Sequence, residues 1–108
     1  IALFYQGLEM TLASAAMLEK HDADIVAFCH DSKMIFFGQK DIAHMYKRIK
    51  EELLALRSEI EKMEKAGDSE GEMVDKLFQA NYRGFMTRLY PPDYIRNVAP
   101  LLLKAIHK

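Results

Sequence analysis

The sequence predicts an all-α fold, a bundle of four or five helices built around a long antiparallel helical hairpin of about residues 41–66 and 70–89. Two observations predict this class. Apolar residues recur at intervals of three and four, the period of an amphipathic helix. The 108 residues include three prolines and five glycines, and most of them stand where a helix should end. We expect one helical domain over 1–108. The chain starts with Ile1 and not with Met, which is consistent with a fragment of a longer chain.

The first arm of the hairpin is the helix predicted over 41–66. Its apolar residues form a single stripe: Ile42, Met45, Ile49, Leu53, Leu56, Ile60 and Met63. Asp41 is suited to cap its start, and Gly67 to end it in a left-handed conformation. Opposite charges one turn apart, such as Lys47 and Glu51, indicate that the other faces are exposed.

The second arm begins at Ser69 and Glu72, which have the spacing of a capping box. A linker of about three residues joins the two arms and favours antiparallel packing. The stretch YPPD at 90–93 ends the second arm, because proline removes a backbone donor and restricts the preceding residue. The last segment is helical too, with Pro100 either at a kink or in the first turn of a shorter helix.

The first forty residues carry less regular signals. A helix is expected over 3–20, and it is apolar on most sides, which indicates burial in a core or at a subunit interface. The large apolar residues of this candidate interface are Leu3, Phe4, Leu8, Leu12 and Leu18. Residues 25–37 are expected to form one helix or two short ones, closed by Gly38. A strand over 34–37 is the alternative, which we disfavour because no partner strand is evident.

The stretch FCHDSKMIFF at 28–37 contains the single cysteine of the chain beside a histidine and an aspartate. Neighbouring residues on a helix point about 100° apart, so Cys29 and His30 do not converge there. Zinc sites need about four ligands at suitable spacing, and the chain has no CxxC or HExxH motif. The residues of a possible metal site are His21, Asp24, Cys29, His30 and His44. We predict no metal, no cofactor and no catalytic residue.

Charge and motifs exclude several classes of partner. The net charge is −1, so no long-range field attracts nucleic acid or an anionic membrane, and neither is predicted as a partner. No GxxxxGK[ST] or GxGxxG motif occurs, and nucleotide phosphates therefore have no predicted site. A single cysteine fits a reducing compartment, so we expect a cytoplasmic protein.

Three functions are compatible with this pattern. The first is a non-catalytic helical interaction module, either a homodimer or an adaptor that binds another protein. The second is a small-molecule sensor with an apolar ligand in a pocket between helices. Its expected lining residues are Phe28, Met34, Phe36, Phe37, Tyr82 and Phe85. The third is a metal-dependent enzyme that uses the histidine, aspartate and cysteine residues above.

One resemblance involves the centre of the chain. A long helix, Ala66-Gly67, the stretch DSEGEM at 68–73 and a second helix follow one another. This order resembles the antibiotic-binding helical domain of some MerR-type regulators. The resemblance covers about a third of the chain and rests on helix-capping residues, and the first forty residues do not follow it. No site residue is carried over from it.

Overall fold

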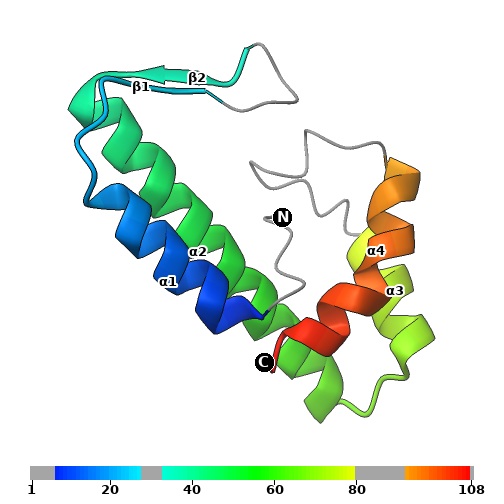
Figure 1. The fold of residues 1–108 in the computed structure, drawn as a ribbon. Coiled ribbons are helices and arrows are strands. Elements are labelled where there is room, and N and C mark those ends of the chain that lie inside the picture. Colours follow the sequence, from blue (N-terminus) through cyan, green and yellow to red (C-terminus); the bar gives the residue numbers. More distant parts are fainter. Residues whose placement is uncertain (1–6, 28–32, 80–91, 108) are drawn as a thin grey trace.

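The computed structural model describes residues 7–27, 33–79 and 92–107, and most of them are helical (Figure 1). The predicted helical class is therefore confirmed. The elements in chain order are α1 (Leu8–Glu19), β1 (Ile25–Ala27), β2 (Ile35–Phe37), α2 (Gly38–Lys65), α3 (Glu70–Gln79) and α4 (Pro92–Ala105). Pro100 lies inside α4, which continues past it.

Helices α1 and α2 lie side by side and run in opposite directions (Figure 1). An ion pair stands near each end of their contact. The Glu19 carboxylate lies 2.7 Å from the Lys50 ammonium group, and the Glu9 carboxylate lies 2.9 Å from the Arg57 guanidinium group. The predicted apolar stripe of α2 is buried along most of the helix, except at Met63, which is half-buried. Its buried members are Ile42, Met45, Ile49, Leu53, Leu56 and Ile60.

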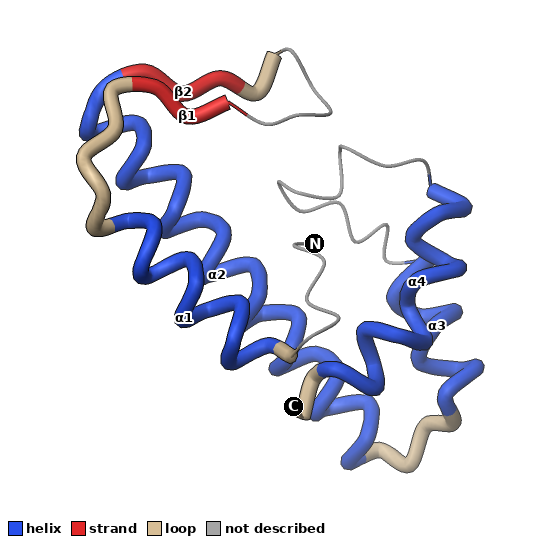
Figure 2. Tube along the Cα trace, viewed as in Figure 1, coloured by secondary structure: helices blue, strands red, loops and turns tan. Residues whose placement is uncertain are grey.

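Helices α3 and α4 form a second pair, which meets the C-terminal end of α2 (Figure 2). Arg96 of α4 lies 3.3 Å from Asp75 of α3, and His107, just beyond α4, lies 3.0 Å from Glu64 of α2. The predicted hairpin of 41–66 and 70–89 is not confirmed. The chain does turn where expected, but the main helical neighbour of α3 is α4 and that of α2 is α1. Residues 80–91 lie outside the described residues.

One apolar core joins both helix pairs. It combines the α2 stripe with Leu8 of α1, Met34 before β2, Met73 and Leu77 of α3, Leu103 and Ala105 of α4, and Ile106 directly after it. Burial of apolar side chains in such a cluster is the main term that stabilises the fold.

The turn between α2 and α3 follows the prediction from sequence. Gly67 has φ 83°, and its N–H donates to the Glu64 carbonyl, while the Asp68 N–H donates to the Met63 carbonyl. These two bonds satisfy carbonyls that a helix end leaves open. Ser69 and Glu72 form the capping box: the Ser69 N–H donates to the Glu72 carboxylate, and the Glu72 N–H donates to the Ser69 hydroxyl.

Two glycines near this turn should respond oppositely to alanine. Neither has an atom within 4 Å of an added Cβ, so the effect is conformational. Gly67→Ala forces alanine into the left-handed region, and we expect a loss of about 1 kcal/mol in unfolding free energy. Gly71→Ala lies within α3 and should gain about 0.5 kcal/mol through helix propensity. Urea unfolding followed by circular dichroism measures both, and changes of the same sign would contradict this explanation.

The prediction of one helix or two short helices over 25–37 is wrong. Strands β1 and β2 form an antiparallel pair in which Ile25 lies opposite Phe37, Val26 opposite Phe36 and Ala27 opposite Ile35. The partner strand judged absent is thus part of the same segment. β-branched and aromatic residues favour a pleated, half-buried surface. In both strands, inward and outward side chains alternate. Val26 and Phe36 pack against the core, and the other four point outward.

Gly38 joins the sheet to α2 and does not close a helix as predicted. Its φ is 82°, and its N–H donates to the carbonyl of Asp24 at 2.9 Å. The sharp turn from strand to helix requires this conformation, which glycine adopts without a steric penalty. Helix α2 therefore begins three residues before the predicted cap, and Asp41 lies in its first turn, where a carboxylate favours the helix dipole.

Candidate interaction surface and apolar pocket

The outward face of α1 is apolar and exposed. Met10, Ala13 and Met17 lie at i, i+3 and i+7, so they share one face of the helix. Met10 and Met17 are 56% and 58% exposed, and Ala13 is exposed between them. The opposite face holds the buried residues Leu8 and Ala15. Helix α1 is thus apolar on two sides, and α2 covers one of them.

The sheet also carries an apolar outward face. The exposed residues are Ile25, Ala27, Ile35 and Phe37, and they form two cross-strand pairs. Phe37 is 61% exposed. Because Val26 and Phe36 pack inward, both faces of this short sheet are apolar. Contiguous exposed apolar side chains of this kind often mark an interaction surface.

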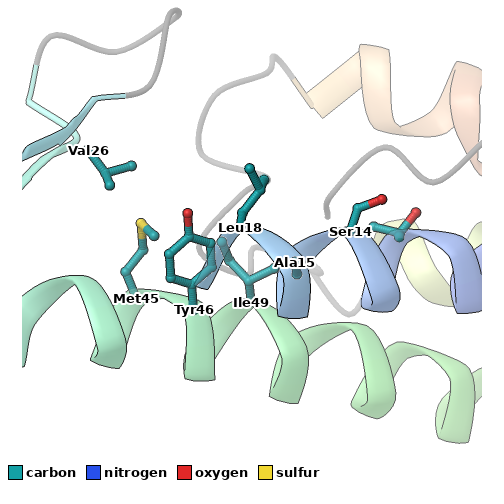
Figure 3. A pocket seen from close by; sticks show the side chains of 8 residues that line it. Ser14, Ala15, Leu18, Val26, Met45, Tyr46 and Ile49 are labelled. Carbon is teal, nitrogen blue, oxygen red and sulfur yellow. The ribbon is translucent and has the colours of Figure 1, made fainter. Parts of the chain in front are cut away.

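A pocket of about 270 Å³ lies between α1, α2 and β1 (Figure 3). It is lined by Thr11, Ser14, Ala15, Leu18, Val26, Met45, Tyr46 and Ile49. Met45, Tyr46 and Ile49 rise from α2, Val26 descends from the sheet, and Leu18 closes the side toward α1 (Figure 3). The walls are almost wholly apolar.

Of the expected ligand-binding residues, the structure describes Met34, Phe36 and Phe37, and none of these three lines the pocket. Met34 is buried in the core, Phe36 packs against that core, and Phe37 points outward. Phe28, Tyr82 and Phe85 lie outside the described residues.

The expected interface residues that the structure describes differ in their burial. Leu8 is fully buried within its own chain, Leu12 packs against the core, and Leu18 is half exposed at the pocket. Leu3 and Phe4 lie outside the described residues. The exposed large apolar residues of α1 that the sequence did not single out are Met10 and Met17.

Three of the five candidate metal ligands, His21, Asp24 and His44, are among the described residues, and they do not form a group. His21, Asp24 and His44 are each exposed to solvent. Within 7–27, 33–79 and 92–107, no three His, Cys, Asp or Glu side chains are grouped so that they could hold a metal ion. Cys29 and His30 lie outside these ranges.

The pocket residues were missed because they come from three elements. A sequence signal did exist: Ser14 and Ala15 are small and lie between Thr11 and Leu18 on α1, where a bulky side chain would fill the space against α2. The third wall of the pocket is Val26 of β1. Its position depends on how the sheet packs, and the sheet was not predicted.

Comparisons with family models, with curated proteins and with solved structures give no match to this chain. The resemblance of its centre to MerR-type regulators therefore has no support from them. In the part of the chain that the structure describes, no helix combines the length and apolarity needed to cross a bilayer.

Proposed function

We propose that the chain is a non-catalytic interaction module that forms a homodimer through the outward face of α1. The observation that carries this proposal is the exposed, uncharged stripe of Met10, Ala13 and Met17. An apolar stripe at helical spacing is stabilised when it packs against a second helix. Methionine suits such a contact because its flexible side chain adapts to the opposite surface.

A second copy fits this stripe in an antiparallel arrangement. If a two-fold axis passes beside Ala13, Met10 lies opposite the partner's Met17, and the reverse contact is equivalent. The small side chain of Ala13 at the centre lets the two helices approach closely, within the usual interaxial distance of about 8–10 Å.

Charge also favours this arrangement. Glu9 and Lys20 lie on the same flank of α1, since eleven residues at 100° each bring them within about 20° of one another. In the antiparallel dimer, Glu9 and the partner's Lys20 are offset by about 3 Å along the helix axis, given a rise of 1.5 Å per residue. Both side chains are exposed, and Glu9 retains accessible surface beside Arg57. The two new contacts pair opposite charges.

The contact is small. Helix α1 has 12 residues and is about 18 Å long, so its face alone buries less than the roughly 1,200 Å² of a standard interface. We therefore expect a weak dimer with a dissociation constant in the micromolar range.

Sedimentation velocity over a concentration series tests the dimer. Met17→Glu places a carboxylate in both halves of the contact, and we expect the dissociation constant to rise at least about 100-fold because each charge loses water without a partner. Leu101→Glu is the matched control, since Leu101 is a half-exposed residue of α4, and it should dimerise as the wild type does. A wild-type chain that stays monomeric up to about 1 mM, far above the expected micromolar range, would refute the proposal. Equal association of the two variants would do the same.

A further inference from the structure

We propose that the pocket between α1, α2 and β1 is a second site, which binds a neutral, mostly apolar small molecule with one hydrogen-bonding group. This inference is independent of dimer formation. Thr11, Ala15 and Leu18 face the pocket from α1 at i, i+4 and i+7, whereas Met10 and Met17 lie about 100° away on the helix. The pocket can therefore be altered from these positions, α2 or β1 without changing the dimer stripe, whereas Ser14, which also lines the pocket, lies one turn from Met10.

Water is a poor occupant of this pocket. At about 30 Å³ for each molecule in the liquid, 270 Å³ corresponds to about nine waters, which find hydrogen-bond partners in one another and in the outside solvent but few in the walls. The lining supplies three side-chain hydroxyls, on Thr11, Ser14 and Tyr46. That of Thr11 already bonds the Gly7 carbonyl at 2.9 Å. An apolar occupant therefore gains from displacing water that is poorly bound.

The walls also select against charge. None of the eight lining residues carries a charge at neutral pH, and an ionised ligand would lose hydration without a counter-charge. The Tyr46 hydroxyl stands at the outer end of its ring, between Val26 and Leu18 (Figure 3). It is placed to exchange a hydrogen bond with a polar group near the mouth, while the rest of the ligand lies against Met45 and Ile49.

The floor of the pocket is formed by packed residues. Met45, Ile49 and Ala15 are buried where α1 meets α2, so the separation of these walls is set by the core. Leu18 and Val26 at the rim are more exposed and have room to adjust to a ligand. Pockets of this kind, preformed and apolar with few polar groups, are typical small-molecule sites.

The volume sets the ligand size. An apolar cavity of about 150 Å³ holds benzene, with six heavy atoms, and the same ratio gives about eleven heavy atoms here. The probe 1-naphthol has this size and one hydroxyl, and 1-methylnaphthalene has the same size without it. At ordinary affinity per atom, we expect 1-naphthol to bind with a dissociation constant of roughly 0.1 mM.

The test titrates the full chain into a fixed low concentration of each probe and follows probe fluorescence. Tyr46→Phe removes the hydroxyl and keeps the volume. It should weaken 1-naphthol binding about fivefold, the loss of one hydrogen bond, and leave 1-methylnaphthalene within about twofold of wild type. A general loss of packing would weaken both probes equally, and that outcome would overturn the role of Tyr46.

Filling the pocket is the second arm. Val26→Phe points the added ring into the pocket and should weaken both probes at least about tenfold, since the free volume is lost. Ile25→Phe is the matched control, because Ile25 is the neighbouring residue on the outward face of the sheet, and it should bind as wild type. Ser14→Leu fills the space from an exposed position on α1 and repeats the test without touching the sheet. Because Ser14 lies one turn from Met10, sedimentation velocity of this variant checks that its association is unchanged. Absence of binding to the wild type near 1 mM, about ten times the expected constant, or unchanged binding in both filled variants, would overturn the proposal.

Discussion

The Leu53→Ala variant is expected to lose about 3–4 kcal/mol of unfolding free energy. Leu53 is 1% exposed and lies in the middle of the buried stripe of α2. Truncation removes buried methyl groups and leaves a cavity that the packed neighbours fill only in part, and measured losses for such sites are about 2–5 kcal/mol. For a domain of this size, that loss is a large share of a total stability of about 5–15 kcal/mol.

The adjacent residue is the control for this prediction. Leu54 is 42% exposed, so the same substitution removes less buried surface, and alanine's helix propensity offsets part of the loss. We expect Leu54→Ala to change stability by less than about 1 kcal/mol. Urea unfolding compares the two variants, with the midpoint shifting and the slope unchanged. Similar losses at both positions would show that α2 does not bury the face described.

Phe36→Ala is expected to have the second-largest effect, a loss of about 2 kcal/mol. Phe36 lies opposite Val26 in the sheet, and both pack against the core. The substitution removes a partly buried aromatic ring and a cross-strand contact, and a fully buried ring would cost about 3–5 kcal/mol. Because the sheet has two short strands, it depends on this packing for stability.

Phe37→Ala is the matched variant on the other face. Phe37 is exposed and packs less, so we expect a loss below about 1 kcal/mol. Hydrogen exchange of the β1 and β2 amides adds a local measurement: protection should fall strongly in Phe36→Ala and little in Phe37→Ala. A greater loss in Phe37→Ala would mean that the register of the two strands is shifted by one residue.

The parts of the fold that local sequence determines were predictable. The α2 stripe runs from Ile42 to Met63 within a helix of 28 residues, long enough for its period to exclude a strand. The stop at Gly67 and the box of Ser69 and Glu72 depend on backbone chemistry within a few residues. These features are present where the sequence places them.

The sheet and the pairing of helices were not predictable in the same way. Ile25–Ala27 and Ile35–Phe37 are three residues each, too short for their period to separate a strand from part of a helix. The partner of α3 depends on tertiary contacts, since a short turn permits several angles between successive helices. The linker length therefore predicted a turn but not which helix would lie beside α3.

The candidate sites were the least predictable features. The sequence showed that the first helix is apolar on most sides. Which of its apolar faces is exposed depends on which face packs against α2, and the sequence does not show that. Met10 and Met17 are exposed for that reason, while Leu8 is buried. The pocket depends on Val26, whose strand was not predicted, and on Tyr46, which lies between two members of the α2 stripe.

The pairing of neighbouring elements also bears on how quickly the chain folds. Helices α1 and α2 are consecutive helices, as are α3 and α4, and the sheet is formed within one connecting segment. Helical domains, in which most contacts lie within helices, fold in microseconds to milliseconds, and here the ion pairs between helices join residues 21 to 48 positions apart. Each helix pair can form its own contacts before the two pairs pack together at the end of α2. The two helix pairs can therefore form separately, and their meeting at the end of α2 completes the core.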